Sequence, residues 1–208
     1  MLKKDTSLNL NSVPNESNIE LKTILDFYED YLMSKIFVYH LDNDVCIKLK
    51  FHKSNFCHLL GLHYITSPNT NHIRYEGNFG YNKIKKDGLS FETLESINKH
   101  EYELNKNRII YFPFVYQLLQ NPNAIDFDKT KIGKCNVDCK IMFYDEYHNV
   151  NIHLGIRGNT EYFFPVTFLV ELIGNTYKGD KFIQKQKTRK VYKVDIQPRF
   201  NEDSFSKS

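Results

Sequence analysis

The sequence predicts an α+β fold, with helices in its first part and an antiparallel sheet in its last third. Apolar residues recur at helical spacing over residues 19–34, and alternation with a period of two takes over near residue 137. Because helices precede strands, we expect helices 19–34 and 90–120 to pack on one face of a four-stranded antiparallel sheet. The four strand patterns cover residues 137–145, 150–157, 162–170 and 189–196.

The length of 208 residues suits one domain with short ends. Residues 1–17 are polar and predict a disordered lead-in, and residues 198–208 predict a flexible tail. The single domain is expected over residues 18–197. Asn18 is placed to cap its first helix, whose apolar face is formed by Leu21, Ile24, Leu25, Tyr28 and Leu32.

A β-hairpin and a short helix are predicted next. Residues 36–41 have a strand pattern, residues 42–44 form a polar turn, and apolar residues alternate with polar ones over residues 45–51. A short helix then begins at Ser54 or Asn55 and ends at Gly61.

The middle of the chain predicts a long loop followed by two helices. Residues 66–88 are rich in Asn, Gly and Lys and predict the loop. One helix is expected over residues 90–98 and another over residues 106–120, in which Pro113 marks either a kink or the first turn.

Charge and cysteine content limit the partners and the cellular compartment that are expected for the protein. The net charge of +3 is small, but Lys and Arg outnumber Asp over residues 178–199. This basic stretch fits either a solvated edge strand or a surface that faces phosphates. No apolar run is long enough for a transmembrane helix, and the N-terminus lacks the apolar region of a secretory signal. We therefore expect a cytoplasmic protein that does not meet the membrane, with reduced thiols at Cys46, Cys57, Cys135 and Cys139.

His58 is the first candidate for chemistry, because a polar side chain stands inside the apolar run around Leu59 and Leu60. RNA can be cut without a metal if its own 2′-OH attacks the phosphorus, which requires a general base and donors for the phosphoryl oxygens. A histidine can be that base. The competing interpretation is a core histidine bonded to a backbone carbonyl.

Thr167 and a basic segment supply the other candidates. Thr167 interrupts the apolar strand 162–170, although a β-branched residue also suits a strand without any function. Side chains of the segment 184–190 are expected to face the same side as Thr167 if the strands pair. Lys187 or Arg189 would then hold the scissile phosphate. Further phosphate contacts are predicted from Arg157, Gln184, Gln186 and Lys190; the alternative is a solvated basic turn.

A metal site is the main chemical alternative. Cys135 and Cys139 precede His148 and His153 at a spacing that resembles a zinc finger, but the intervening gap of eight residues is shorter than the twelve or so of a ββα finger. Residues 150–157 also predict a strand where such a finger needs a helix. We therefore expect neither a bound metal nor a cofactor.

Two segments far apart in the chain resemble the phage-borne group of barnase–EndoU–colicin–RelE-like nucleases. The similarity spans roughly residues 37–196, and its first motif is FxHLLGL. The second motif, FFPxTF, has Thr167 where the family pattern has a hydroxyl residue. The matching residues are Phe56, His58, Leu59, Leu60, Gly61 and Leu62, then Phe163, Phe164, Pro165, Thr167 and Phe168, then Tyr177, Gln184, Gln186, Lys187, Lys190 and Val191.

The resemblance implies a barnase/RelE-like fold and a metal-independent endoribonuclease that uses a His, a hydroxyl and a basic residue. His58, Thr167 and Lys187 are the expected catalytic residues. The protein would be a toxin or a phage or mobile-element effector, with RNA as substrate and an antitoxin or immunity protein as a partner. The alternative is a non-catalytic protein-binding module, such as a mobile-element inhibitor or a regulator of antiphage defence. Convergence of the three residues on one open cleft would favour the enzyme.

Overall fold

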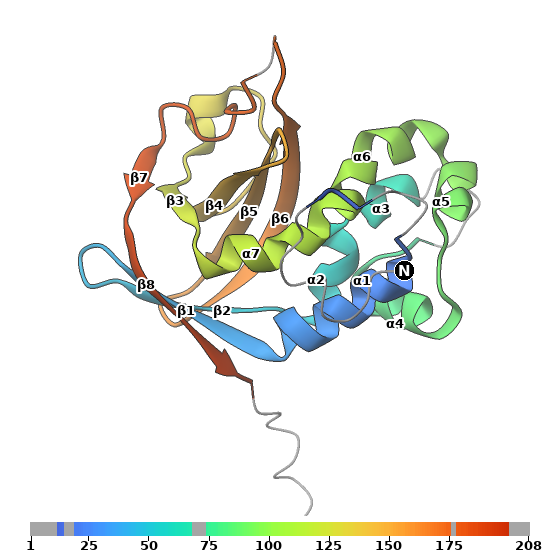
Figure 1. The fold of residues 1–208 in the computed structure, drawn as a ribbon, viewed down its shortest axis with the longest axis horizontal. Helices are drawn as coiled ribbons and strands as arrows, with labels where there is room; N and C mark the ends of the chain where they lie inside the picture. Colours follow the sequence, from blue (N-terminus) through green and yellow to red (C-terminus); the bar gives the residue numbers. More distant parts are fainter. Residues whose placement is uncertain (1–11, 15–18, 68–73, 176–177, 200–208) are drawn as a thin grey trace, which may run out of the picture.

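The computed structural model describes residues 12–14, 19–67, 74–175 and 178–199, and it confirms the α+β class. Helices gather at one side of the molecule and a curled sheet forms the other (Figure 1). Most of the predicted lead-in 1–17 and residues 200–208 of the predicted tail lie outside the described residues.

The helical part follows the predicted order with two differences. The first helix is confirmed as α1 (Leu21–Phe27) and the π-helical turn η2 (Tyr28–Met33). The short helix is confirmed as α2 (Lys53–Leu59), followed by α3 (Leu62–Ile65). The loop predicted over residues 66–88 was wrong in its second half, where α4 (Gly77–Asp87) forms and buries Tyr81 and Ile84.

Helix α5 (Phe91–Ile97) confirms the helix predicted over residues 90–98. The next predicted helix is longer than expected and is interrupted at Pro113. It comprises α6 (Lys99–Tyr111), the 3-10 turn η3 (Phe112–Phe114) and α7 (Val115–Gln120). Proline lacks the N–H that an α-helical turn needs, which accounts for the interruption.

Within the described residues, eight strands form one sheet in the order β7-β3-β4-β5-β6-β2-β1-β8. The predicted hairpin and strands are present, and β3, β7 and the short 3-10 turn η4 (Lys129–Ile132) were not predicted. The strands are β1 (Lys35–Leu41), β2 (Cys46–Lys50), β3 (Asn123–Asp126), β4 (Ile141–Tyr147), β5 (Val150–Gly158), β6 (Tyr162–Leu172), β7 (Lys187–Arg189) and β8 (Val191–Pro198).

The expectation of four antiparallel strands was wrong, because the hairpin joins the sheet and the last strand pairs elsewhere. Strand β2 lies parallel to β6, and β8 pairs with β1. Strands β7 and β8 stand at opposite ends of the strand order although only Lys190 separates them in sequence, so the sheet curls until its edges approach. Alternation identifies a strand but not its partner, which explains the error.

Both faces of the sheet are covered. Helices pack on one face, where Phe112 meets Phe168 edge to face with ring centroids 5.3 Å apart. A smaller cluster on the other face centres on Met142 and is covered by Phe182 and Ile183 from the segment that precedes β7. Among the described residues, no helix is both long and apolar enough to cross a membrane.

Candidate functional site

The candidate site lies where α2 meets a bulge in β6. Gly155 pairs with Thr167 and Ile156 pairs with Pro165, so Val166 is the extra residue of the bulge. A bulge interrupts the ladder and re-aims the groups around it. The carbonyl oxygen of Val166 therefore accepts a hydrogen bond from outside the sheet.

That bond comes from His58, whose Nε2 lies 2.8 Å from the Val166 oxygen. A carbonyl oxygen only accepts hydrogen bonds, so Nε2 carries the hydrogen and Nδ1 holds the lone pair of the neutral ring. Asn55, one turn earlier on α2, donates to the Pro165 oxygen at 3.3 Å and accepts from the His52 N–H at 2.9 Å. Two side chains of α2 thus fix this helix to the bulge.

A cleft of about 660 Å³ opens beside these contacts, and we call it the His58 cleft. Helix α2, the start of α4, the segment before β4 and the bulge of β6 surround it. Its lining residues are Ser54, Asn55, His58, His63, Arg74, Glu76, Gly77, Asn136, Asp138, Arg157, Pro165 and Val166.

Two histidine rings stack at the cleft. The centroids of His58 and His63 are 4.5 Å apart at an interplanar angle of 22°. Burial lowers the pKa of His63 to about 4, with a further contribution from the neighbouring His58. Burial also lowers the pKa of His58 below its usual 6.5, and the hydrogen bond to Val166 only partly opposes this effect. Both rings are therefore neutral at pH 7.

Two arginines supply positive charge at the cleft. Arg157 forms an ion pair with Asp138, and Nε of Arg74 lies 3.0 Å from the carboxylate of Glu76. All four side chains are well exposed, so these ion pairs are weak and a phosphate can compete for the guanidinium groups.

Comparison with known protein families identifies the family of the chain. The model of the phage-Barnase-EndoU-ColicinE5/D-RelE like nuclease4 family matches residues 20–204. The chain belongs to this family. The resemblance inferred from the sequence is confirmed, and it is a family of nuclease-like proteins. No curated protein and no solved structure matches the chain.

In this member of the nuclease family, two of the eight predicted site residues share the His58 cleft, namely His58 and Arg157. Thr167 lies one residue beyond Val166 but does not line the cleft. Its side chain is 9% exposed and packs against Gly155, where an added Cβ would come within 2.7 Å of the Thr167 methyl carbon.

Two predicted residues of the basic segment, Lys187 and Arg189, lie on β7, four positions from β6 in the strand order. Lys187 is exposed on β7, with Nζ 3.7 Å from the Asp126 carboxylate. Arg189 contacts Asp126 at 2.6 Å and Asp42 at 3.0 Å, so it joins the two edges of the curled sheet. The two hydrogen bonds raise the pKa of Arg189, which stays charged.

The remaining three predicted residues have local partners. The side chain of Gln186 accepts from the Asp128 N–H at 2.9 Å and donates to the Asp128 oxygen at 3.1 Å. Gln184 donates to Asp180, and the ammonium group of Lys190 lies 4.7 Å from the ring centroid of Tyr192. The segment does not pair with the strand of Thr167, because β7 pairs with β3.

The sequence analysis did not place His63 beside His58. The available signal was Gly61, which adopts a left-handed conformation with φ of 74°. This conformation, which glycine adopts without strain, ends α2 and starts α3, and it brings His63 back over His58. Arg74 and Asn136 had no sequence signal, since they reach the cleft only through the fold.

The four residues of the zinc-finger alternative do not form a ligand set. Among the described ranges, no group of three or more His, Cys, Asp or Glu side chains is placed to hold a metal ion. Cys139 is a buried free thiol beside Gly155, and burial raises its pKa to about 12. His153 is fully buried against Glu171.

Proposed function

We propose that the protein is an endoribonuclease that cuts RNA without a metal, with His58 as the general base. The observation that carries the proposal is the 2.8 Å contact between His58 Nε2 and the Val166 oxygen at an open cleft. This contact selects one tautomer, and the lowered pKa keeps the ring neutral at pH 7. A neutral, oriented imidazole is what a general base requires.

In the proposed reaction, Nδ1 of His58 takes the proton of a ribose 2′-OH. The 2′ oxygen attacks the adjacent phosphorus, and the bond from phosphorus to the 5′ oxygen breaks. The leaving oxygen takes a proton from solvent water, because both histidines are neutral before the reaction. The products are a 2′,3′-cyclic phosphate and a free 5′-OH. Arg157 and Arg74 stabilise the charge that develops on the phosphoryl oxygens.

Thr167 and Lys187 stay predicted phosphate contacts in this proposal. Thr167→Val removes the hydroxyl at nearly constant volume, and Lys187→Gln removes the charge. If either residue touches the phosphate in the transition state, the variant loses about 10²-fold or more in rate. If the rate stays within a few-fold of wild type, the residue does not contact the phosphate: Thr167 then serves only in packing, and Lys187 only as an exposed polar residue.

A non-catalytic protein-binding module is the second candidate. The observation that favours it is the separation of His58, Thr167 and Lys187, which do not share one cleft. In either case we infer an effector or regulator of phage or mobile-element origin. A toxin would act in the cytoplasm and be restrained by an antitoxin or immunity protein.

The test uses purified protein, 5′-labelled single-stranded RNA and matched single-stranded DNA, each with EDTA and without it. The proposal expects RNA to be cut in the presence of EDTA and DNA to stay intact, because DNA has no 2′-OH. Mass spectrometry of the products should show 2′,3′-cyclic phosphate ends. Cutting that stops with EDTA, or equal cutting of DNA, contradicts the chemistry; no cutting at all favours the binding module.

A further inference from the structure

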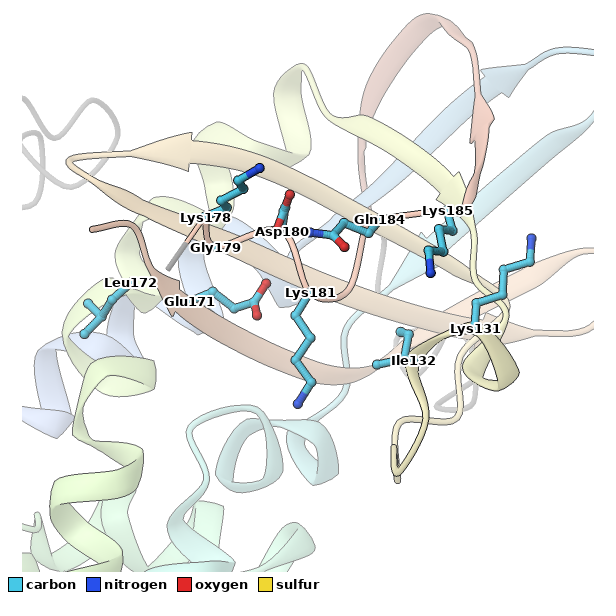
Figure 2. A pocket seen from close by; sticks show the side chains of 10 residues that line it. All are labelled: Lys131, Ile132, Glu171, Leu172, Lys178, Gly179, Asp180, Lys181, Gln184 and Lys185. Carbon is cyan, nitrogen blue, oxygen red and sulfur yellow. Dashed lines mark hydrogen bonds between the residues drawn. The ribbon is translucent and has the colours of Figure 1, made fainter. Parts of the chain in front are cut away.

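A second pocket, of about 720 Å³, lies at the opposite end of β6 from the His58 cleft. We call it the lysine pocket. Four lysines line it: Lys131, Lys178, Lys181 and Lys185. Figure 2 shows them spread around the pocket, with the carboxylates of Glu171 and Asp180 between them. The lysines come from the 3-10 turn η4 and from the segment that precedes β7.

The Asp180 carboxylate has a hydrogen-bond partner within the protein, and the Glu171 carboxylate lies close to a buried histidine. Asp180 Oδ1 accepts from Gln184 Nε2 at 2.5 Å, and the backbone oxygen of Asp180 accepts from the N–H groups of Ile183 and Gln184. The Glu171 carboxylate lies 3.0 Å from Nε2 of the fully buried His153. Among the described residues, none of the four lysines forms an ion pair, so the pocket has an excess of free positive charge.

The lysine pocket and the His58 cleft lie at one face of the sheet. From Val166 to Glu171, β6 advances five residues, or about 17 Å at about 3.3 Å per residue. On β5, Arg157 at the cleft and His153 behind the pocket are four residues apart, and alternate residues of a strand face the same side. Positively charged side chains thus stand at both ends of one surface.

One segment of chain connects the two ends. Lys131 and Ile132 line the lysine pocket, and Asn136 and Asp138 line the His58 cleft. Lys134 lies between them and is exposed. An RNA strand that runs along this segment from the cleft would pass Lys134 before it reaches Lys131.

We propose that the lysine pocket is a second, non-catalytic phosphate site, which holds the backbone of the same RNA strand several nucleotides from the cut. This inference rests on the proposed function. Lysine ammonium groups that are not already paired are suited to phosphates, and their binding releases counterions from the strand. Leu172, which is 58% exposed, and Ile132 add apolar surface at the pocket against which a sugar or base can lie.

The test compares two double variants in the His58→Ala background, so that RNA stays intact during binding. One is Lys181→Gln with Lys185→Gln; the control is Lys86→Gln with Lys99→Gln, which removes the same charge from the exposed faces of α4 and α6. Fluorescence anisotropy measures the Kd for a twelve-nucleotide RNA, for a dinucleotide and for a polyglutamate peptide over a range of salt concentrations.

The pocket variant should bind the long RNA roughly tenfold more weakly than the control, and its salt slope should fall by about 1.4, or about 0.7 for each lost phosphate contact. The Kd of the dinucleotide should not change. Equal affinities of pocket variant and control for the long RNA overturn the inference. A loss confined to polyglutamate also overturns it and assigns the pocket to an acidic protein.

The two proposals fail separately. If the long RNA binds through the lysines but wild type never cuts it, the pocket is a phosphate site and the nuclease proposal fails. The pocket substitutions are also made in protein that keeps His58. If wild type cuts RNA and this variant has the wild-type KM, the nuclease proposal stands and the inference of a second phosphate site fails. The expected result in the active background is a raised KM with an unchanged kcat.

Discussion

Nε2 of His58 donates a hydrogen bond of 2.8 Å to the carbonyl oxygen of Val166, the residue that the bulge in β6 leaves outside the regular pairing. This contact joins a helix and a strand that are more than a hundred residues apart in sequence. It also fixes which ring nitrogen carries the lone pair. The orientation of the proposed general base therefore depends on the bulge and on the anchoring of α2.

Asn55 provides a test of that anchoring. Its side chain bonds to the His52 N–H and the Pro165 oxygen, so Asn55→Ala should cost about 1 kcal/mol of stability and release α2 from the bulge. We expect a tenfold or greater fall in kcat, because His58 loses its position. Urea unfolding measures the stability and a cleavage assay measures the rate.

Asn98→Ala is the matched control, since the Asn98 side chain caps α6 by accepting from the Glu101 N–H at 3.2 Å. It should lose similar stability and keep the wild-type rate. Equal rates for the two variants would show that the Asn55 contacts do not position His58.

The depressed pKa of His63 predicts how stability depends on pH. Its pKa is about 4 in the folded protein against 6.5 for an ordinary histidine. Between these values the unfolded chain binds more protons, so stability should fall as pH drops from about 6.5 to about 4. His63→Gln should flatten this part of the curve. Urea unfolding at several pH values measures it, and an unchanged slope in the variant would contradict the assignment.

Arg189 should contribute mainly to stability. Its guanidinium contacts Asp126 and Asp42 at the closure of the curled sheet, and the side chain is 19% exposed. Arg189→Ala should lower stability by about 1 kcal/mol, the upper end for partly screened ion pairs, with less effect at high salt. Thermal unfolding at low and high salt measures this. A loss of RNA affinity without a loss of stability would instead support the phosphate contact predicted from the sequence.

Gly155 tests the packing beside the bulge. A Cβ at this position would lie 2.7 Å from the Thr167 methyl carbon and 3.0 Å from the Cys139 sulfur. Gly155→Ala should therefore destabilise the protein by about 1–3 kcal/mol. Gly174→Ala is the control, because a Cβ there meets no atom within 4 Å. Chemical denaturation compares the two variants, and equal stabilities would show that the strand can shift to make room.

Local patterns predicted the elements better than their arrangement. The alternation of β5 and β6 and the apolar spacing of α1 identified these elements, because each buries one face. The parallel pairing of β2 with β6 and the pairing of β8 with β1 depend on contacts between distant segments, which no local period encodes. The helix α4 was hidden by its many polar residues and by Gly77 and Gly80.

The same distinction applies to the site. His58 could be identified because it is a polar residue in an apolar helix and lies within a recognisable sequence motif. Arg74, Asn136 and Asp138 reach the cleft from loops and strand ends, so only the fold brings them to it. The basic segment 184–190 was visible by charge, but its partners Asp126, Asp128 and Asp42 could not be read from the sequence.

The role of His58 as a base in RNA cleavage is tested most directly by the single-turnover cleavage rate of wild type and of His58→Ala, each measured with saturating protein. His100→Ala is the control, because His100 is exposed on α6 away from the cleft. Loss of a general base costs about 10²–10⁴-fold, so His58→Ala should lose that much while it stays folded, with a melting temperature lowered by only a few degrees through loss of the bond to Val166. His100→Ala should keep the full rate. Cleavage by His58→Ala at the wild-type rate would contradict a role of His58 as the base.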